Sequence, residues 1–188
     1  MKKELKEAIE DSPIITAVKD DEGLEKALSC DSRIIFILYG DVLSIKNIVG
    51  RVKESGKLAF VHMDLIHGLQ QKEIAVDFIK ESTACDGIIS TKANLISRGK
   101  ELGLYTVMRF FAIDSMAYEN IEKQMKLTKP DIIEVLPGPM PKVVKKIVGL
   151  AKCPVIAGGL VSDKEDVLLL LDAGASCISS TNEKVWFL

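Results

Sequence analysis

Short apolar runs rich in Val, Ile, Leu and Phe alternate along this chain with amphipathic stretches of helical periodicity. Such runs are typical of strands buried on both faces, and the stretches between them are typical of the crossover helices of a parallel sheet. The predicted strands cover residues 13–18, 33–39, 57–64, 87–92, 104–111, 131–136, 154–160 and 176–180. The predicted helices include 24–28, 45–54, 73–80, 94–102, 115–127, 142–150 and 164–171, with a short helix at the end.

Eight strands with helices between them predict an α/β fold, a compact TIM-type (β/α)8 barrel that forms a single domain over residues 1–188. The length of 188 residues and the hydrophobic content of 47% suffice for one sizeable core. An open Rossmann sheet has fewer strands, and its glycine fingerprint does not follow the first strand here. An open flavodoxin-like sheet is the alternative fold.

Composition limits the possible partners and compartments. The net charge of −2 provides no global basic field for nucleic acid, so any RNA contact requires a local patch. The four cysteines lack CxxC spacing, which indicates reduced core thiols and neither a metal site nor disulfides. The charged segment 1–7 predicts the start of a helix, and no apolar run approaches the length of a membrane span. We expect a soluble, cytoplasmic protein with no membrane partner.

Two strand ends together predict a phosphate site. Gly158 and Gly159 close the seventh predicted strand, and Ser180 and Thr181 close the eighth just before a short helix. Adjacent glycines let backbone N–H groups approach an anion, and a helix N-terminus adds a positive dipole end. The loops after strands 7 and 8 of a TIM barrel commonly hold phosphate.

Side-chain alternation along the predicted strands gathers polar residues on the inward face. These residues are His62 and Asp64 on the third strand, Ser90 and Lys92 on the fourth, Arg109 on the fifth and Glu134 on the sixth. Buried charges must be paired or open to the barrel mouth. Two interpretations remain open, a structural ion-pair layer and a polar ligand pocket at the carboxyl ends of the strands.

Three lysines on the predicted helix 142–150 form a candidate RNA contact. Lys142, Lys145 and Lys146 share one stripe of this helix, opposite its apolar positions. A solvated helix face explains the stripe without any function. A few lysines also suffice for a local contact with the phosphate backbone of RNA.

Several motifs, in this order and spacing, make the chain resemble the glycerol-3-phosphate-responsive antiterminator family, the GlpP-type regulators of glycerol uptake operons. The resemblance covers nearly the whole chain. It rests on the segments His62–Gly68, Gly87–Lys92 with Asn94, Arg109–Ser115, Asp131–Gly138 with Pro141–Val143, Ala157–Gly159, Ala173–Ala175 and Ser180–Asn182 with Trp186.

The resemblance implies a cytoplasmic regulator, with no catalytic residues, that binds glycerol 3-phosphate as its effector, needs no cofactor or metal, and acts on the leader of a messenger RNA by transcription antitermination. Under it, the phosphate is expected on the strand-end residues and the polyol on the inward polar residues. The expected phosphate contacts are Gly158, Gly159, Ser180 and Thr181, and the expected polyol or charge contacts are His62, Asp64, Lys92, Arg109 and Glu134.

Two other functions remain alternatives. A phosphate-sugar enzyme of the epimerase or isomerase kind could use the same barrel, since a fold does not fix a function. The chain has only two histidines, both on or just after the third predicted strand, so no second strand donates a histidine ligand to a metal. A polyol-phosphate storage or interaction protein without an RNA role is the other alternative. A homo-oligomer is possible, and its state is left open.

Overall fold

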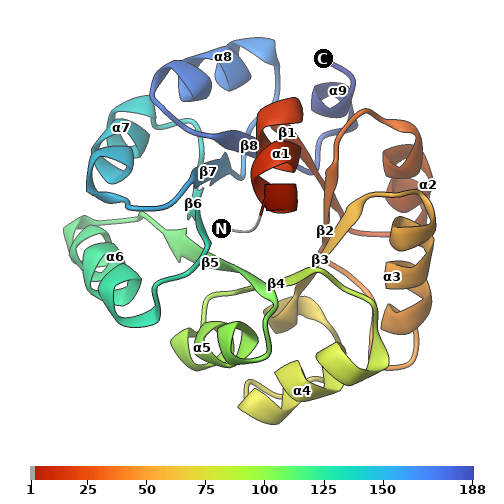
Figure 1. Cartoon of the computed structure of the whole chain (residues 1–188). Coiled ribbons are helices and arrows are strands. Elements are labelled where there is room, and N and C mark those ends of the chain that lie inside the picture. Colours follow the sequence, from red (N-terminus) through yellow and green to blue (C-terminus); the bar gives the residue numbers. More distant parts are fainter. Residues whose placement is uncertain (1–2) are drawn as a thin grey trace.

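The structure is a computed structural model, and it describes residues 3–188. All eight strands pair in parallel in the order β1-β2-β3-β4-β5-β6-β7-β8, and β8 closes on β1 (Figure 1). The chain thus folds as a TIM barrel, as the sequence predicts. The strands are β1 (Ile14–Val18), β2 (Ile34–Ile37), β3 (Leu58–His62), β4 (Gly87–Ser90), β5 (Tyr105–Phe111), β6 (Ile132–Leu136), β7 (Val155–Gly158) and β8 (Cys177–Ser180).

Helices surround the barrel as an outer ring (Figure 1). They are α2 (Asp21–Ser29), α3 (Ile45–Glu54), α4 (Glu73–Ser82), α5 (Ala93–Glu101), α6 (Ser115–Thr128), α7 (Pro141–Leu150), α8 (Lys164–Asp172) and the short α9 (Glu183–Trp186). Local signals fix several of their starts. Asp114 accepts a hydrogen bond from the N–H of Ala117 at 2.7 Å as the N-cap of α6, and Pro141 occupies the first turn of α7.

Alternation along the strands separates two apolar cores. Phe36, Phe60 and Val107 point into the lumen, whereas Ile35, Val61 and Ile88 pack between the barrel and the helices. Every residue of β1 to β4 is buried, as expected of strands covered on one face by helices and on the other by the filled lumen.

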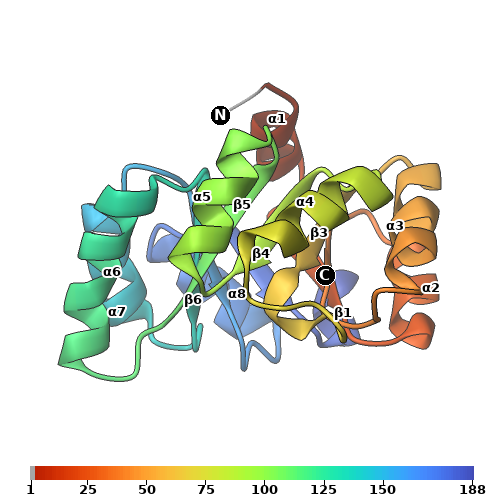
Figure 2. The same ribbon diagram turned by 90° about the horizontal axis from the view of Figure 1, so that it is seen from below.

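The helix α1 (Lys3–Asp11) closes the amino-terminal end of the barrel. Its residues Leu5, Ala8 and Ile9 belong to the same buried cluster as the lumen residues (Figures 1 and 2). The predicted helix start at Met1 and Lys2 lies outside the described residues. With this end filled, a ligand site is expected at the carboxyl ends of the strands.

The third and fourth strands end earlier than predicted, and this changes where polar side chains lie. The third strand ends at His62, and a 3-10 turn, η1 (Met63–Leu65), follows it. The fourth strand ends at Ser90, so Lys92 lies beyond it as the residue before α5. None of the helices over residues 3–188 has both the length and the apolar character needed to span a bilayer.

Candidate functional site

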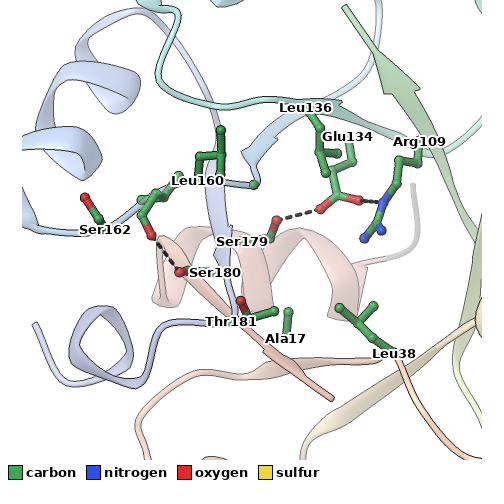
Figure 3. Close-up of a pocket in the computed structure, with 12 residues that line it drawn as sticks. Ala17, Leu38, Arg109, Glu134, Leu136, Leu160, Ser162, Ser179, Ser180 and Thr181 are labelled. Atoms are coloured by element: carbon green, nitrogen blue, oxygen red, sulfur yellow. Dashed lines mark hydrogen bonds and ion pairs between the residues drawn. The ribbon is translucent and has the colours of Figure 1, made fainter.

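Three side chains from β5, β6 and β8 form a buried network at the upper end of the lumen. Arg109 and Glu134 are register partners, and Arg109 Nε donates to Glu134 Oε2 at 2.6 Å. Ser179 Oγ donates to Glu134 Oε1 at 2.5 Å (Figure 3). Glu134 is 1% exposed, so its charge depends on these two donors for compensation.

Gly158 leaves the space through which the Ser179–Glu134 hydrogen bond passes. A Cβ atom at this position would lie 2.1 Å from Ser179 Oγ and 2.9 Å from Glu134 Oε1. The sequence predicts that this glycine exposes backbone N–H groups to an anion. The structure gives it a second role, because the buried network requires the absence of a side chain here.

The chain turns sharply after β7, at the edge of the same pocket. Gly159 and Leu160 both have left-handed backbone dihedrals, with φ values of 71° and 61°. Leucine rarely adopts this conformation, and Leu160 is also 80% exposed. The turn is held by a hydrogen bond of 3.0 Å from the N–H of Gly138 to the carbonyl of Gly159. Strain of this kind concentrates at functional sites.

The network and the turn border a pocket of about 370 Å³, within the size range of sites for small molecules. Arg109 is its only cationic side chain, and Figure 3 draws no partner for the two terminal nitrogens of this residue among the residues that line the pocket. The pocket is lined by Ala17, Leu38, Arg109, Glu134, Leu136, Gly159, Leu160, Val161, Ser162, Ser179, Ser180 and Thr181.

Both helix starts at this pocket are already capped by side chains of the protein. Asp163 accepts from the N–H of Asp166 at 3.0 Å, and Asp166 Oδ2 accepts from the N–H of Ser162 at 2.9 Å at the start of α8. Asn182 Oδ1 accepts from the N–H of Lys184 at 3.1 Å in α9. The positive charge available to an anion here therefore comes mainly from Arg109 rather than from a helix dipole.

His62 lies in the lumen, and neither ring nitrogen has a hydrogen-bond partner among residues 3–188. It lies on the same face of β3 as Phe60 and is 2% exposed. Burial and the nearby positive charge of Arg109 lower its pKa to about 4, against an opposing effect of Asp64. At neutral pH the imidazole is therefore uncharged and retains one unused donor and one unused acceptor.

Asp64 accepts hydrogen bonds from residues at the end of β4 and does not line the pocket described above. It accepts from Ser90 Oγ at 2.6 Å, from the Thr91 N–H at 2.8 Å and from Thr91 Oγ1 at 2.7 Å. Burial alone would raise its pKa, but these three donors outweigh burial and hold the pKa below its usual value. The predicted strand position of Asp64 is wrong, because the 3-10 turn carries the carboxylate sideways to β4.

The predicted inward orientation of Ser90 and Lys92 is also wrong. Ile89 packs in the lumen, and Ile88 packs toward the helices, so Ser90 follows Ile88 to the outer face. Gly87 explains the choice of face, since a Cβ atom there would lie 2.5 Å from the Phe60 ring. Lys92 is exposed and lies outside the pocket lining. Its predicted contact with a ligand remains a prediction.

The remaining predicted contacts divide between the pocket and the outer surface. Gly159, Ser180 and Thr181 line the pocket, and Ser180 Oγ donates to the Val161 carbonyl at 3.1 Å. The predicted RNA contacts Lys142, Lys145 and Lys146 are all exposed on α7. Their roles stay predictions.

Sequence reasoning overlooked Ser179. The alternation on β8 identifies it, because Cys177 belongs to the lumen cluster and Ser179 is two residues further along the strand. Within residues 3–188, no three side chains of His, Cys, Asp or Glu lie close enough together to hold a metal ion.

Comparison with known proteins identifies the family. The family model described as "Glycerol-3-phosphate responsive antiterminator" matches residues 14–186. The chain belongs to this family. It is 43% identical over 177 residues to the uncharacterized protein YgcP of Escherichia coli K12, covering 94% of this chain and 93% of that protein.

Two solved structures are similar to this antiterminator-family chain over nearly its full length. The glycerol uptake operon antiterminator regulatory protein of Listeria monocytogenes is 35% identical, with a TM-score of 0.89 over 92% of this chain and 94% of that one. The glycerol uptake operon antiterminator-related protein of Thermotoga maritima is 35% identical, with a TM-score of 0.82 over 93% and 98%. The barrel and the family are thus established together.

Proposed function

We propose that this chain is a glycerol-3-phosphate-responsive regulator of transcription antitermination that acts on the leader messenger RNA of glycerol-utilisation operons. The family match over residues 14–186 carries this proposal. The pocket at the carboxyl ends of the strands supports it, because its volume of about 370 Å³ and its lining suit a small phosphorylated polyol.

The chemistry of the pocket suggests how such a ligand would be held. The terminal nitrogens of Arg109 offer a planar pair of donors to a phosphate or hydroxyl oxygen. Ser180 and Thr181, with the turn at Gly159, supply further polar groups on the opposite wall. Glu134 and Ser179 are placed to read the polyol hydroxyl groups, because a carboxylate accepts hydrogen bonds and a hydroxyl both donates and accepts.

The proposal makes the protein a sensor and not an enzyme. The alternative of a metal-dependent epimerase has no specific support, because the Asp64 carboxylate is occupied by donors from Ser90 and Thr91 and no metal-ligand cluster is found among residues 3–188. Binding without turnover is therefore expected.

Two measurements test this function. Calorimetric titration with glycerol 3-phosphate should give a stoichiometric complex, and glycerol or inorganic phosphate alone should bind much more weakly. A gel-shift assay with a leader transcript of a glycerol uptake operon, at one stated low salt concentration, should change when glycerol 3-phosphate is added. Absence of binding at millimolar ligand would refute the sensor, and an unchanged gel shift would refute the ligand control of RNA.

A further inference from the structure

A second concavity lies far from the ligand pocket, between the carboxyl-terminal ends of α6 and α7. Its volume is about 430 Å³. We call it the α6–α7 groove. It is lined by Glu122, Met125, Lys126, Lys129, Pro130, Leu150, Lys152 and Cys153. Figure 1 shows α6 and α7 side by side on one flank of the barrel, remote from α3.

The groove combines an apolar floor with an excess of positive charge. Three of its residues are lysines, and Glu122 is its only carboxylate. Glu122 already accepts from Lys126 Nζ at 2.7 Å. Lys129 and Lys152 are exposed, and neither forms a salt bridge with any residue in the range 3–188. No aromatic side chain from the described part of the chain lines the groove, so a nucleotide base would lie against Met125, Pro130 and Leu150 by apolar contact, with the lysines beside it for the phosphate.

Lys129 is held in a conformation that favours glycine. It ends α6 with φ 46° and ψ 56°, the left-handed position where glycine is the usual residue. Its N–H donates to the Met125 carbonyl at 3.0 Å, and its carbonyl accepts from Lys100 Nζ. The left-handed backbone alone would favour glycine, whereas a cation at the carboxyl end of α6 interacts favourably with the helix dipole. Lys129 therefore keeps a positive charge at the edge of the groove in spite of its backbone conformation.

The helix α7, which carries the lysine stripe, ends at the groove. Leu150, at the end of this helix, forms one wall of the groove. Lys146, Lys145 and Lys142 are exposed along the same helix toward its start. A chain of phosphates that leaves the groove along α7 therefore meets further cations.

We propose that the α6–α7 groove binds one nucleotide of a single-stranded RNA, with its base on the apolar floor and the flanking phosphates on Lys126, Lys129 and Lys152. The inference rests on the proposed function, of which it specifies the RNA-binding surface. Contact of a base face with the groove floor requires an unpaired base, so the protein should prefer single-stranded RNA over a duplex of the same sequence.

The start of α7 also connects this surface to the ligand pocket. The loop before Pro141 is fixed to β7 by the hydrogen bond from Gly138 to Gly159, and Gly159 lines the pocket. A ligand that shifts the turn at Gly159 would move the first residues of α7 with it. Ligand and RNA would then influence each other through one packed element.

Charge-removal variants test the groove. We compare K126Q/K129Q/K152Q with K46Q/K72Q/K80Q, a control that removes three exposed lysines from α3, α4 and the residue preceding α4. For a leader transcript of a glycerol uptake operon, the groove variant should raise Kd at least about tenfold, and the slope of log Kd against log salt should fall by about 2. The control variant should bind as the wild type, and both should retain glycerol 3-phosphate binding.

A single substitution separates binding from folding. K129G should raise the thermal midpoint, because glycine suits the left-handed position, and should still weaken RNA binding by about threefold. Weaker RNA binding by a more stable variant cannot be explained by unfolding. The proposal is overturned if K129G binds RNA as tightly as the wild type and the groove variant does so too.

The alkylation rate of Cys153 reports whether the groove is occupied. It is partly exposed, whereas the other three cysteines are buried. Burial raises its pKa to about 11, so alkylation with iodoacetamide is run at mildly alkaline pH and read by mass spectrometry. RNA should slow alkylation of Cys153 several-fold, and glycerol 3-phosphate alone should not. Protection that rises with protein concentration and needs no RNA would instead assign the groove to a second copy of the chain.

The outcomes also separate this proposal from the function on which it rests. If the wild type, the control and the groove variant bind leader RNA equally well, the groove is not the RNA-binding surface. The proposed RNA-binding function would still stand. A wild-type protein that binds glycerol 3-phosphate but no leader RNA overturns both the groove and the RNA half of the proposed function.

Discussion

Arg109 and Glu134 face each other across adjacent strands, and the 2.6 Å bond between them is the one ion pair that places a charge at the upper end of the described lumen. The second carboxylate oxygen of Glu134 accepts a hydrogen bond from Ser179 Oγ at 2.5 Å. The carboxylate therefore joins three strands of the barrel. Because Glu134 is almost completely buried, removal of either donor is expected to affect both stability and ligand binding.

Replacement of Arg109 by Met should lower the free energy of unfolding by about 3–5 kcal/mol, because it leaves a buried carboxylate without its cation. R109M/E134L removes both charges and should recover most of that loss. Neither variant should bind glycerol 3-phosphate, since both lack the only cation of the pocket. Urea denaturation and calorimetry measure the two effects. A double variant as unstable as R109M would show that the ion pair is not the cause.

Replacement of Gly158 by Ala should break the hydrogen bond between Ser179 and Glu134, because the added Cβ would lie 2.1 Å from Ser179 Oγ. The expected loss of stability is about 1–3 kcal/mol, typical of overpacking in a core. S179A removes the clashing oxygen, so G158A/S179A should be less destabilised than the sum of the two single variants. Additive losses, measured in urea, would contradict this account.

His62 should make stability depend on pH. Its pKa is about 4 in the folded protein, compared with about 6.5 for an unfolded histidine. As the pH falls from 6.5 to 4, the unfolded state takes up the proton and the folded state does not, so stability decreases in that window. The contribution is on the order of 3 kcal/mol, complete above pH 6.5 and lost near pH 4. H62Q should show a shallower decrease in denaturation midpoints over this window, and an identical profile would exclude His62 as its source.

Lys57 should stabilise the barrel without influencing the ligand. Its buried Nζ donates to the carbonyls of Cys30 at 2.5 Å and of Ser32 at 2.7 Å, at the end of the barrel away from the pocket. K57M leaves both carbonyls without this donor and should cost about 2–3 kcal/mol. Glycerol 3-phosphate affinity, measured well below the melting temperature, should be unchanged. A large loss of affinity would mean that the two ends of the barrel are coupled.

The arrangement of the barrel could be predicted from the sequence because it depends on a repeated pattern. The apolar runs and the helical stretches between them are local signals, and the observed strand starts differ from the predicted ones by at most one residue. The inward faces of β5 and β6 were also predictable, since Arg109 and Glu134 each lie two residues after an apolar lumen residue, Val107 and Ile132.

The ends of β3 and β4 could not be predicted in the same way. Ile88 and Ile89 are equally apolar, so alternation alone does not say which one enters the lumen. The close approach of Gly87 to Phe60 makes that choice, and it depends on register between strands. The three donors that Asp64 meets likewise come from a different strand end, and no spacing along the chain reveals them.

The closure of one barrel end by α1 restricts how a bound molecule can be detected. Leu5 fills that end, so the pocket can exchange with solvent only on the opposite face. The lysines of α6 and α7 lie outside the barrel wall and never meet the small molecule directly. We expect a bound ligand to influence these lysines through the barrel wall, where the hydrogen bond from Gly138 to Gly159 joins the loop before α7 to the turn after β7.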